Sequence, residues 1–231
     1  MNRFIQSVKD IDLVTATSII DADPKWLDWT ERDGKNALHF LCGVAVGDDP
    51  VRAADSLKLL KMLLGRGMDI NSVHRIEEKN CDPFPATPLW YAYTRGRNEI
   101  LYKYLLKTGA DPNNCMWAIA WYDDVAAGKL FLKYGAHIDE RPNLNELFLG
   151  AYGWRRLKFA TWLLELGADV NTPDDKGNTA VMLAAKRKDA DSIRSLISYG
   201  ADPDIKNNEG ISARSIAERN GPKRLLTLFG A

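Results

Sequence analysis

The sequence predicts an all-α repeat solenoid, in which helix-turn-helix units stack side by side and carry β-turn fingers. The stretch "LLELGADVN" at 163–171 returns in four related forms, "LLGRGMDIN", "LLKTGADPN", "FLKYGAHID" and "LISYGADPD". The spacings between successive turn glycines are 42, 26, 32 and 33 residues, counted along Gly67, Gly109, Gly135, Gly167 and Gly200. A self-similar period of this size fixes the architecture before any local motif is weighed.

Residues 174–202 are the clearest unit, and each part of this unit has a physical role. Thr179 is expected to cap a first helix, because its hydroxyl can accept a free backbone N–H. The apolar spacing of Ile193, Leu196 and Ile197 gives a second helix one buried face. That helix is expected to stop at Gly200, since glycine enters the left-handed conformation at little cost.

Several stretches of the chain resemble the ankyrin repeat. They are "DGKNALHFL" at 33–41, "TPLWYA" at 87–92, "GNTAVMLAA" at 177–185 and the recurring "GAD". The resemblance implies units made of a β-turn and two antiparallel helices. It also implies a turn-bracing role for His39, which occupies the family's histidine position.

The resemblance covers nearly the whole chain, since seven units of 33 residues make 231. We therefore expect a single domain over 1–231. Its parts are a degenerate N-terminal capping unit at 1–29, five central units at 30–204 and a C-terminal capping unit at 205–231. The third unit departs from the pattern, because its spacing of 26 residues leaves no room for a full turn before "NCMWAIAW".

Charge and cysteine usage limit the classes of partner. Lys and Arg total 31 and Asp and Glu total 31, so no global field favours nucleic acid or anionic lipid. No apolar leader and no run near about 18 apolar residues is present, which predicts a cytoplasmic protein without a membrane span. Cys42, Cys81 and Cys115 lie far apart and are expected to be reduced thiols.

Catalytic and metal-binding patterns are weak. His74 and Cys81 share one long finger, and such a pair can do nucleophilic chemistry, but no third orienting group is recognisable. The three cysteines and three histidines show neither CxxC nor HExxH spacing. The sequence therefore predicts a protein that is not an enzyme and that holds no metal and no cofactor.

Two units carry insertions that distinguish them from the others. About ten residues, "GVAVGDDPVR", separate the two helices of the second unit, and a tolerated surface loop is the simpler interpretation. The next finger is longer by eight residues and contains Phe84 between two prolines. Phe84 is a candidate partner-binding residue, although packing onto a neighbouring finger is an equal alternative.

The most informative departure is a stripe of variable residues. In ankyrin repeats the two residues after the paired small residues of the first helix resemble a variable position on the concave surface. Alignment from the turn glycines predicts a stripe with an aromatic middle and a basic rim: Arg95, Trp121, Tyr122, Trp154, Arg155, Lys186, Arg187 and Arg219. The alternative is that the tryptophans cover the gap left by the short third unit. Trp90, Trp117 and Trp162 are expected to be packing residues.

Large aromatic and arginine side chains are enriched at interface hot spots. The sequence therefore predicts a non-catalytic module that binds a protein partner with an acidic or mixed acidic and apolar surface. An inhibitor or immunity-type protein that blocks a partner enzyme or toxin is an alternative. A binder of single-stranded nucleic acid is a more remote one, because basic residues among aromatic ones can hold phosphates and stack bases.

Overall fold

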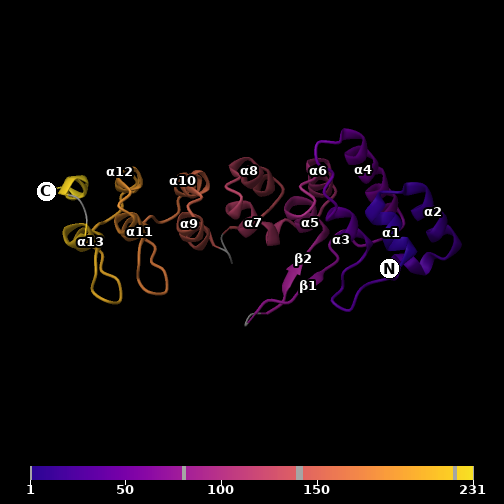
Figure 1. Ribbon diagram of the computed structural model, residues 1–231, viewed down its shortest axis with the longest axis horizontal. Coiled ribbons are helices and arrows are strands. Elements are labelled where there is room, and N and C mark those ends of the chain that lie inside the picture. Colours follow the sequence, from indigo (N-terminus) through magenta and orange to yellow (C-terminus); the bar gives the residue numbers. More distant parts are fainter. Residues whose placement is uncertain (1, 80–81, 139–142, 221–222, 231) are drawn as a thin grey trace. The chain divides into compact units, whose positions relative to one another are not determined.

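The computed structural model describes residues 2–79, 82–138, 143–220 and 223–230. These residues form helices in antiparallel pairs, with loops that project from one end of the pairs (Figure 1). By their internal contacts they fall into two compact units, one of residues 1–115 and 130–136 and one of residues 116–129 and 137–231. The expectation of a single domain stays a prediction.

Most helices of the first unit are short and alternate between the two layers of a pair. They are α1 Arg3–Asp10, α2 Leu13–Ala22, η1 Pro24–Asp28, α3 Ala37–Cys42, α4 Pro50–Gly65, α5 Pro88–Thr94, α6 Glu99–Lys107 and η2 Asn113–Cys115. The helix α8 Val125–Lys133 is divided between the two units. The fold class is therefore the predicted stack of helix-turn-helix units.

The second unit continues the same alternation. Its helices are α7 Met116–Trp121, α9 Leu144–Gly153, α10 Leu157–Glu165, α11 Ala180–Arg187, α12 Ala190–Ser198, α13 Ala213–Asn220 and η3 Lys223–Phe229. Helix α7 follows η2 without a finger, as the short spacing of the third unit predicted. No helix in the described parts of the chain is both long and apolar enough to cross a membrane.

The helix boundaries follow from a few residues. Gly200 has φ of 88°, and the other four turn glycines have φ between 93° and 99°, which is the left-handed region where a side chain is strained. Pro88 opens α5, where its missing N–H costs nothing. Thr179 lies at the N-cap of α11 as predicted, but its buried hydroxyl makes no hydrogen bond within the described residues. The prediction that this hydroxyl accepts a backbone N–H of α11 is therefore wrong.

The insertion in the second unit is only partly a loop. Helix α3 ends at Cys42, and α4 begins at Pro50 after Asp49, whose carboxylate accepts the N–H groups of Val51 and Arg52. Three of the ten inserted residues therefore extend α4 by most of a turn, and the other seven form the connection.

The lengthened finger is an antiparallel ribbon of β1 His74–Ile76 and β2 Phe84–Ala86. It does not stand alone, because the N–H of Arg75 donates to the carbonyl of Asp33 at 2.7 Å in the preceding finger. Main-chain pairing within the ribbon and between the fingers thus fixes the base of the insertion.

Asparagines at the ends of the repeated motif link successive units. The Oδ1 atom of Asn71 accepts the N–H of Asp111 at 2.8 Å, and Oδ1 of Asn171 accepts the N–H of Asp202 at the same distance. In each case the motif of one unit satisfies a backbone donor in the turn of the next. We call these two side chains the latch asparagines.

Helix packing in the second unit depends on matched sizes across the interface. The Gly128 position in α8 lies directly against the rings of Trp162 and Phe159 in α10, since a Cβ added there would lie 2.6 Å from Cζ3 of Trp162. Trp162 is 5% exposed, so the prediction that it is a packing residue is confirmed. A large side chain on one helix here requires a glycine at the facing position of the neighbouring helix.

Candidate functional site

The candidate residues lie where first helices end. Trp121 is the last residue of α7, Trp154 follows α9, and Arg187 is the last residue of α11. Arg95 follows α5, and Arg219 lies in the last turn of α13. The alignment from the turn glycines therefore assigned the predicted positions to equivalent places in their units.

Three tryptophans of the second unit form an exposed group, which we call the aromatic cluster. The rings of Trp121 and Trp154 meet edge to face with centroids 5.1 Å apart, and those of Trp117 and Trp154 do so at 5.4 Å. The exposed fractions are 38% for Trp117, 48% for Trp121 and 39% for Trp154. Three indoles that pack on one another and still face solvent form a continuous apolar surface.

Trp117 was expected to be a packing residue, and this prediction is wrong in part. One face of its ring lies against α9, where a Cβ added to Gly150 would come within 2.5 Å of Cζ3. The remainder of the ring is exposed beside Trp154. No finger precedes α7 that could cover the start of this helix, which explains the exposure. The glycine inside α9 was the sequence signal for a close aromatic contact.

Arg156 is a further member of this surface that the sequence analysis missed. Its guanidinium carbon lies 5.0 Å from the ring centroid of Trp121, the geometry of a cation–π contact. Its Nε atom is buried and has no hydrogen-bond partner among the described residues. Tyr122 follows Trp121 directly and is 42% exposed. The aromatic cluster is thus extended at one side by a cation and at another by a phenol.

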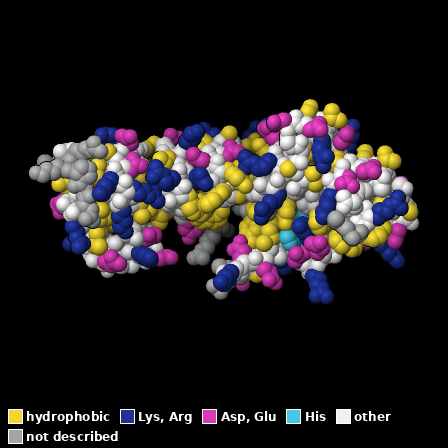
Figure 2. All heavy atoms as spheres, in the orientation of Figure 1, with side chains coloured by type: hydrophobic (Ala, Val, Ile, Leu, Met, Phe, Trp, Pro, Cys, Tyr) yellow, Lys and Arg dark blue, Asp and Glu magenta, His cyan; other side chains and the backbone are white. Residues whose placement is uncertain are grey.

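The predicted cations of α11 differ in their surroundings. Arg187 donates from Nη2 to the carbonyl of Gly153 at 2.8 Å and from Nη1 to that of Tyr152 at 3.4 Å, so it satisfies the C-terminal end of α9. Lys186 donates to Oδ1 of Asn178 at 3.1 Å. Figure 2 shows hydrophobic side chains exposed over α9, with Lys and Arg side chains nearby.

Arg155 and Arg219 are more open to solvent. Arg155 has a left-handed backbone with φ of 61°, and its side chain is 63% exposed and 4.0 Å from Oδ2 of Asp189. Arg219 is exposed on α13. Neither arrangement is that of a buried structural ion pair, and an exposed pair at this distance contributes little to stability.

Arg95 and Phe84 belong to the first unit and are positioned there by one ring. The guanidinium of Arg95 lies 5.6 Å from the ring centroid of Trp90, and the Phe84 ring lies 5.3 Å from it. Phe84 is half-buried in β2 opposite Ile76, so it packs onto the neighbouring helix α5 and not at the far end of the finger. Trp90 is half-buried between them.

Arg95 also borders a hollow of about 520 Å³ with two lysines at its edge. Lys9 and Lys35 both lie over the ring of Phe40, with ammonium-to-centroid distances of 4.5 and 4.6 Å. Tyr91 forms part of the wall. Cations above aromatic rings form an anion-attracting surface at this end of the first unit.

The two histidines of the first unit have structural roles. The Nε2 atom of His39 lies 3.1 Å from the carbonyl oxygen of Ser72 and 3.2 Å from that of Ala86, so it donates across the finger base. This confirms the turn-bracing role. Burial lowers the pKa of His39 from 6.5 to about 4, which keeps the ring neutral near pH 7. His74 is held between Tyr91 and Asp33.

Two cysteines are fully buried. Burial raises the pKa of the Cys42 and Cys115 thiols far above the ordinary range, so neither is a reactive thiolate. Cys81 lies outside the described residues, and so does the His74 and Cys81 pairing considered above. His74 is already bonded at both ring nitrogens.

Comparison with known families agrees with this architecture. The model of ankyrin repeats in many copies matches residues 163–217, and the model of the single ankyrin repeat matches residues 86–117. The chain is similar to an ankyrin repeat-containing protein of Treponema pallidum (strain Nichols), with 41% identity over 71 residues. It is also similar to ankyrin repeat domain-containing protein 63 of Homo sapiens, with 39% identity over 57 residues.

These sequence matches are partial. They span 31% and 25% of this chain and only 24% and 15% of the two relatives. Solved structures match over the full length of this chain and 99% of theirs: the ankyrin repeat domain of Bcl-3, a member of the IkappaB family, with TM-score 0.71 and 18% identity, and that of human ASB11, with TM-score 0.69 and 21% identity.

The fold is thus that of a stacked repeat protein whose units are a turn and two antiparallel helices. The chain is an ankyrin repeat protein. Ankyrin repeat domains generally mediate protein–protein interactions and are typically not catalytic.

Proposed function

We propose that this chain binds a partner protein through the aromatic cluster and the cations beside it, on the concave side of the stack. The observation that carries the proposal is the exposure of Trp117, Trp121 and Trp154 although their rings are already packed on one another. Exposed apolar surface of this kind is costly unless something covers it.

The cations support a partner with an acidic or mixed acidic and apolar surface. Arg156 lies over Trp121, with Arg155 directly before it in the chain. Lys186 and Arg187 lie in the last turn of α11. Opposite charge guides encounter and selects the partner, whereas the aromatic side chains supply most of the affinity. Arg95 with Lys35 offers a second cationic contact in the first unit. Arg219 and Phe84 have peripheral roles in partner binding in this proposal.

The test compares binding of the wild-type chain with that of the variant Trp121→Ala plus Trp154→Ala in affinity purification from the native host. The matched control is Leu166→Ala plus Tyr199→Ala, which truncates two apolar side chains that are 43% and 38% exposed directly after α10 and α12. Each truncated hot-spot side chain is expected to cost about 2 kcal/mol or more of binding.

We expect the tryptophan variant to remain folded by circular dichroism and to lose the main co-purifying protein, while the control retains it. If the tryptophan variant unfolds, the rings belong to the core and the proposal fails. An inhibitor role predicts that the co-purifying protein is an enzyme or toxin whose activity the chain blocks. Recovery of RNA with steep loss at higher salt would instead indicate nucleic-acid binding.

A further inference from the structure

The hollow of about 520 Å³ in the first unit is lined by three cations and, among the described residues, by no carboxylate. The cations are Lys9, Lys35 and Arg95, and the rings of Phe40 and Tyr91 form part of the walls. The whole chain has 31 basic and 31 acidic residues, so this excess of positive charge is local. A concave surface lined by charge of one sign attracts ligands of the opposite sign.

Two of these cations form no ion pair in the described parts of the chain. Lys35 is half-buried, and its ammonium group lies 4.6 Å from the ring centroid of Phe40 and 5.5 Å from that of Tyr91. The guanidinium of Arg95 lies over the ring of Trp90. An aromatic face attracts a cation but does not neutralise its charge. The Lys35 ammonium group has therefore lost part of its hydration without gaining a counter-ion.

The charge at Lys35 is increased by a second ammonium group and is not offset by the carboxylate next to it in the chain. The ammonium group of Lys9 lies 4.5 Å from the centroid of the same Phe40 ring, so two like charges share one ring. Both oxygens of Asp33 are engaged at the finger base, Oδ2 with His74 at 2.8 Å and Oδ1 with the backbone N–H of Lys35 at 3.3 Å. An anion bound beside the ring would offset the repulsion between the two ammonium groups.

The three cations follow the order of the helices in the stack. Lys9 lies in the last turn of α1, Lys35 precedes α3 and Arg95 follows α5, and α3 packs against both α1 and α5. Packed helices lie about 8–10 Å apart, and an extended chain advances about 3.3 Å per residue. An extended segment with acidic residues two or three positions apart therefore matches this row of cations.

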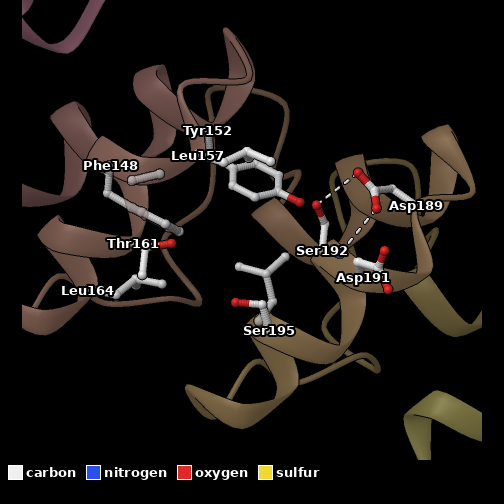
Figure 3. Close-up of a pocket in the computed structure, with 11 residues that line it drawn as sticks. Phe148, Tyr152, Leu157, Thr161, Leu164, Asp189, Asp191, Ser192 and Ser195 are labelled. Atoms are coloured by element: carbon white, nitrogen blue, oxygen red, sulfur yellow. Dashed lines mark hydrogen bonds between the residues drawn. The ribbon is translucent and has the colours of Figure 1, made fainter. Parts of the chain in front are cut away.

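The second unit contains a hollow of the opposite character. It has a volume of about 350 Å³ and lies between the helix pair α9 and α10 and the helix pair α11 and α12 (Figure 3). Asp189 and Asp191 line it, and no lysine or arginine among the described residues does. The hydroxyl of Ser192 donates to Oδ2 of Asp189 at 2.9 Å. Because its charges are negative, this hollow repels an acidic segment and provides an internal control.

We propose that the hollow of the first unit binds an extended acidic segment of a partner protein, whose successive carboxylates meet Lys9, Lys35 and Arg95. The rings next to the cations hold them in position and contact the methylene groups of the segment. The inference rests on the proposed binding of a partner protein and adds a separate site to it. This site belongs to the first compact unit, whereas the aromatic cluster belongs to the second.

The test follows backbone amide shifts of the full chain by NMR while a synthetic peptide of alternating Glu and Ser residues is added. We expect shifts for the amides of Lys35, Phe40, Gly43 and Arg95, and none for those around Ser192 in the acidic hollow. A peptide of alternating Gln and Ser residues should produce no shifts. The proposal is overturned if the acidic peptide produces no response, if both peptides produce equal responses, or if both hollows respond.

A third peptide distinguishes carboxylates from phosphate. It has the Gln and Ser sequence with one phosphoserine and no glutamate. We expect this peptide to bind more weakly than the acidic peptide, because a single anion cannot meet cations of three successive units. Tighter binding of the phosphorylated peptide would show that the hollow selects a phosphate group, and the acidic segment would then be the wrong occupant.

Substitutions of the cations test the site directly. Lys35→Met plus Arg95→Met removes two charges and keeps apolar side chains beside the rings, and we expect about tenfold weaker binding of the acidic peptide. The matched control is Lys58→Met plus Lys103→Met, which makes the same change of net charge on α4 and α6 outside the hollow. Equal losses in the two variants would contradict the proposal. If the first variant does not fold, Arg95→Met alone, at an exposed residue, should weaken binding by about threefold.

A last control separates this site from the proposed function. The variant Trp121→Ala plus Trp154→Ala should bind the acidic peptide as the wild type does, because it changes no residue of the first unit. Retained peptide binding with loss of the partner protein in that variant supports both proposals. Retention of the partner protein by that variant contradicts only the role of the aromatic cluster. Absence of the local amide shifts in the wild type contradicts only the site for an acidic segment.

Discussion

The Nε2 atom of His74 lies 2.8 Å from Oδ2 of Asp33, a residue of the preceding finger. On its other side, Nδ1 of His74 lies 2.7 Å from the hydroxyl oxygen of Tyr91, which is 7% exposed. Partial burial raises the pKa of Asp33, but the hydrogen bonds from His74 and from the Lys35 N–H outweigh it and lower the pKa. These contacts connect the long finger to the preceding finger and to helix α5. We call Asp33, His74 and Tyr91 the finger brace.

Replacement of His74 by alanine should destabilise the fold. It leaves the Tyr91 hydroxyl buried without its partner, and we expect the free energy of unfolding to fall by about 1–3 kcal/mol in urea titrations. Arg75→Ala is the control, because that side chain is exposed on the same strand and its loss should change stability by less than about 0.5 kcal/mol. Equal losses in the two variants would show that the brace contributes nothing.

Protonation of His39 should make stability depend on pH. Its pKa is lowered from 6.5 to about 4 by burial, so between these values the unfolded chain binds a proton that the folded chain does not. The contribution of neutral His39 to the free energy of unfolding is therefore fully present above pH 6.5. It decreases as the pH falls toward 4, by up to about 3 kcal/mol. His39→Gln, which keeps an N–H donor, should show a smaller decrease in urea midpoints over this window. Parallel curves for the two proteins would refute the assignment.

Two threonines at the same N-cap position should respond differently to valine. The Thr87 hydroxyl accepts the N–H of Trp90 at 3.3 Å, so Thr87→Val should cost about 1 kcal/mol. The buried Thr179 hydroxyl has no partner in the described parts of the chain, so Thr179→Val should change stability by less than about 0.5 kcal/mol. Thermal unfolding of both variants checks this difference. A larger loss for Thr179 would mean that its hydroxyl is bonded in solution.

The architecture was readable from sequence because it depends on residues with few alternatives. Only glycine adopts the φ of Gly200 without strain. A proline such as Pro88 is tolerated in the first turn of a helix, where its missing N–H removes no backbone hydrogen bond. Counting from such residues was also enough to assign Trp121 and Trp154 to equivalent helix ends.

Contacts between units were less readable, because they depend on pairs of residues far apart in the chain. Trp117 is exposed since α7 follows η2 without a finger that could cover it, and the residue it packs against, Gly150, lies 33 residues later in the chain. The contact of Arg156 with Trp121 likewise joins two residues that are far apart in the chain. Each becomes visible only when equivalent positions of adjacent units are compared.

The latch asparagines make neighbouring units mechanically dependent. Asn71 and Asn171 each accept a backbone N–H from a turn of the following unit. Separation of a unit from its neighbour therefore breaks this hydrogen bond and leaves both its donor and its acceptor without a partner. Under tension along the chain, such bonds would be loaded one after another and not together. The contacts between units would then break in discrete steps, one unit after another from a free end of the stack.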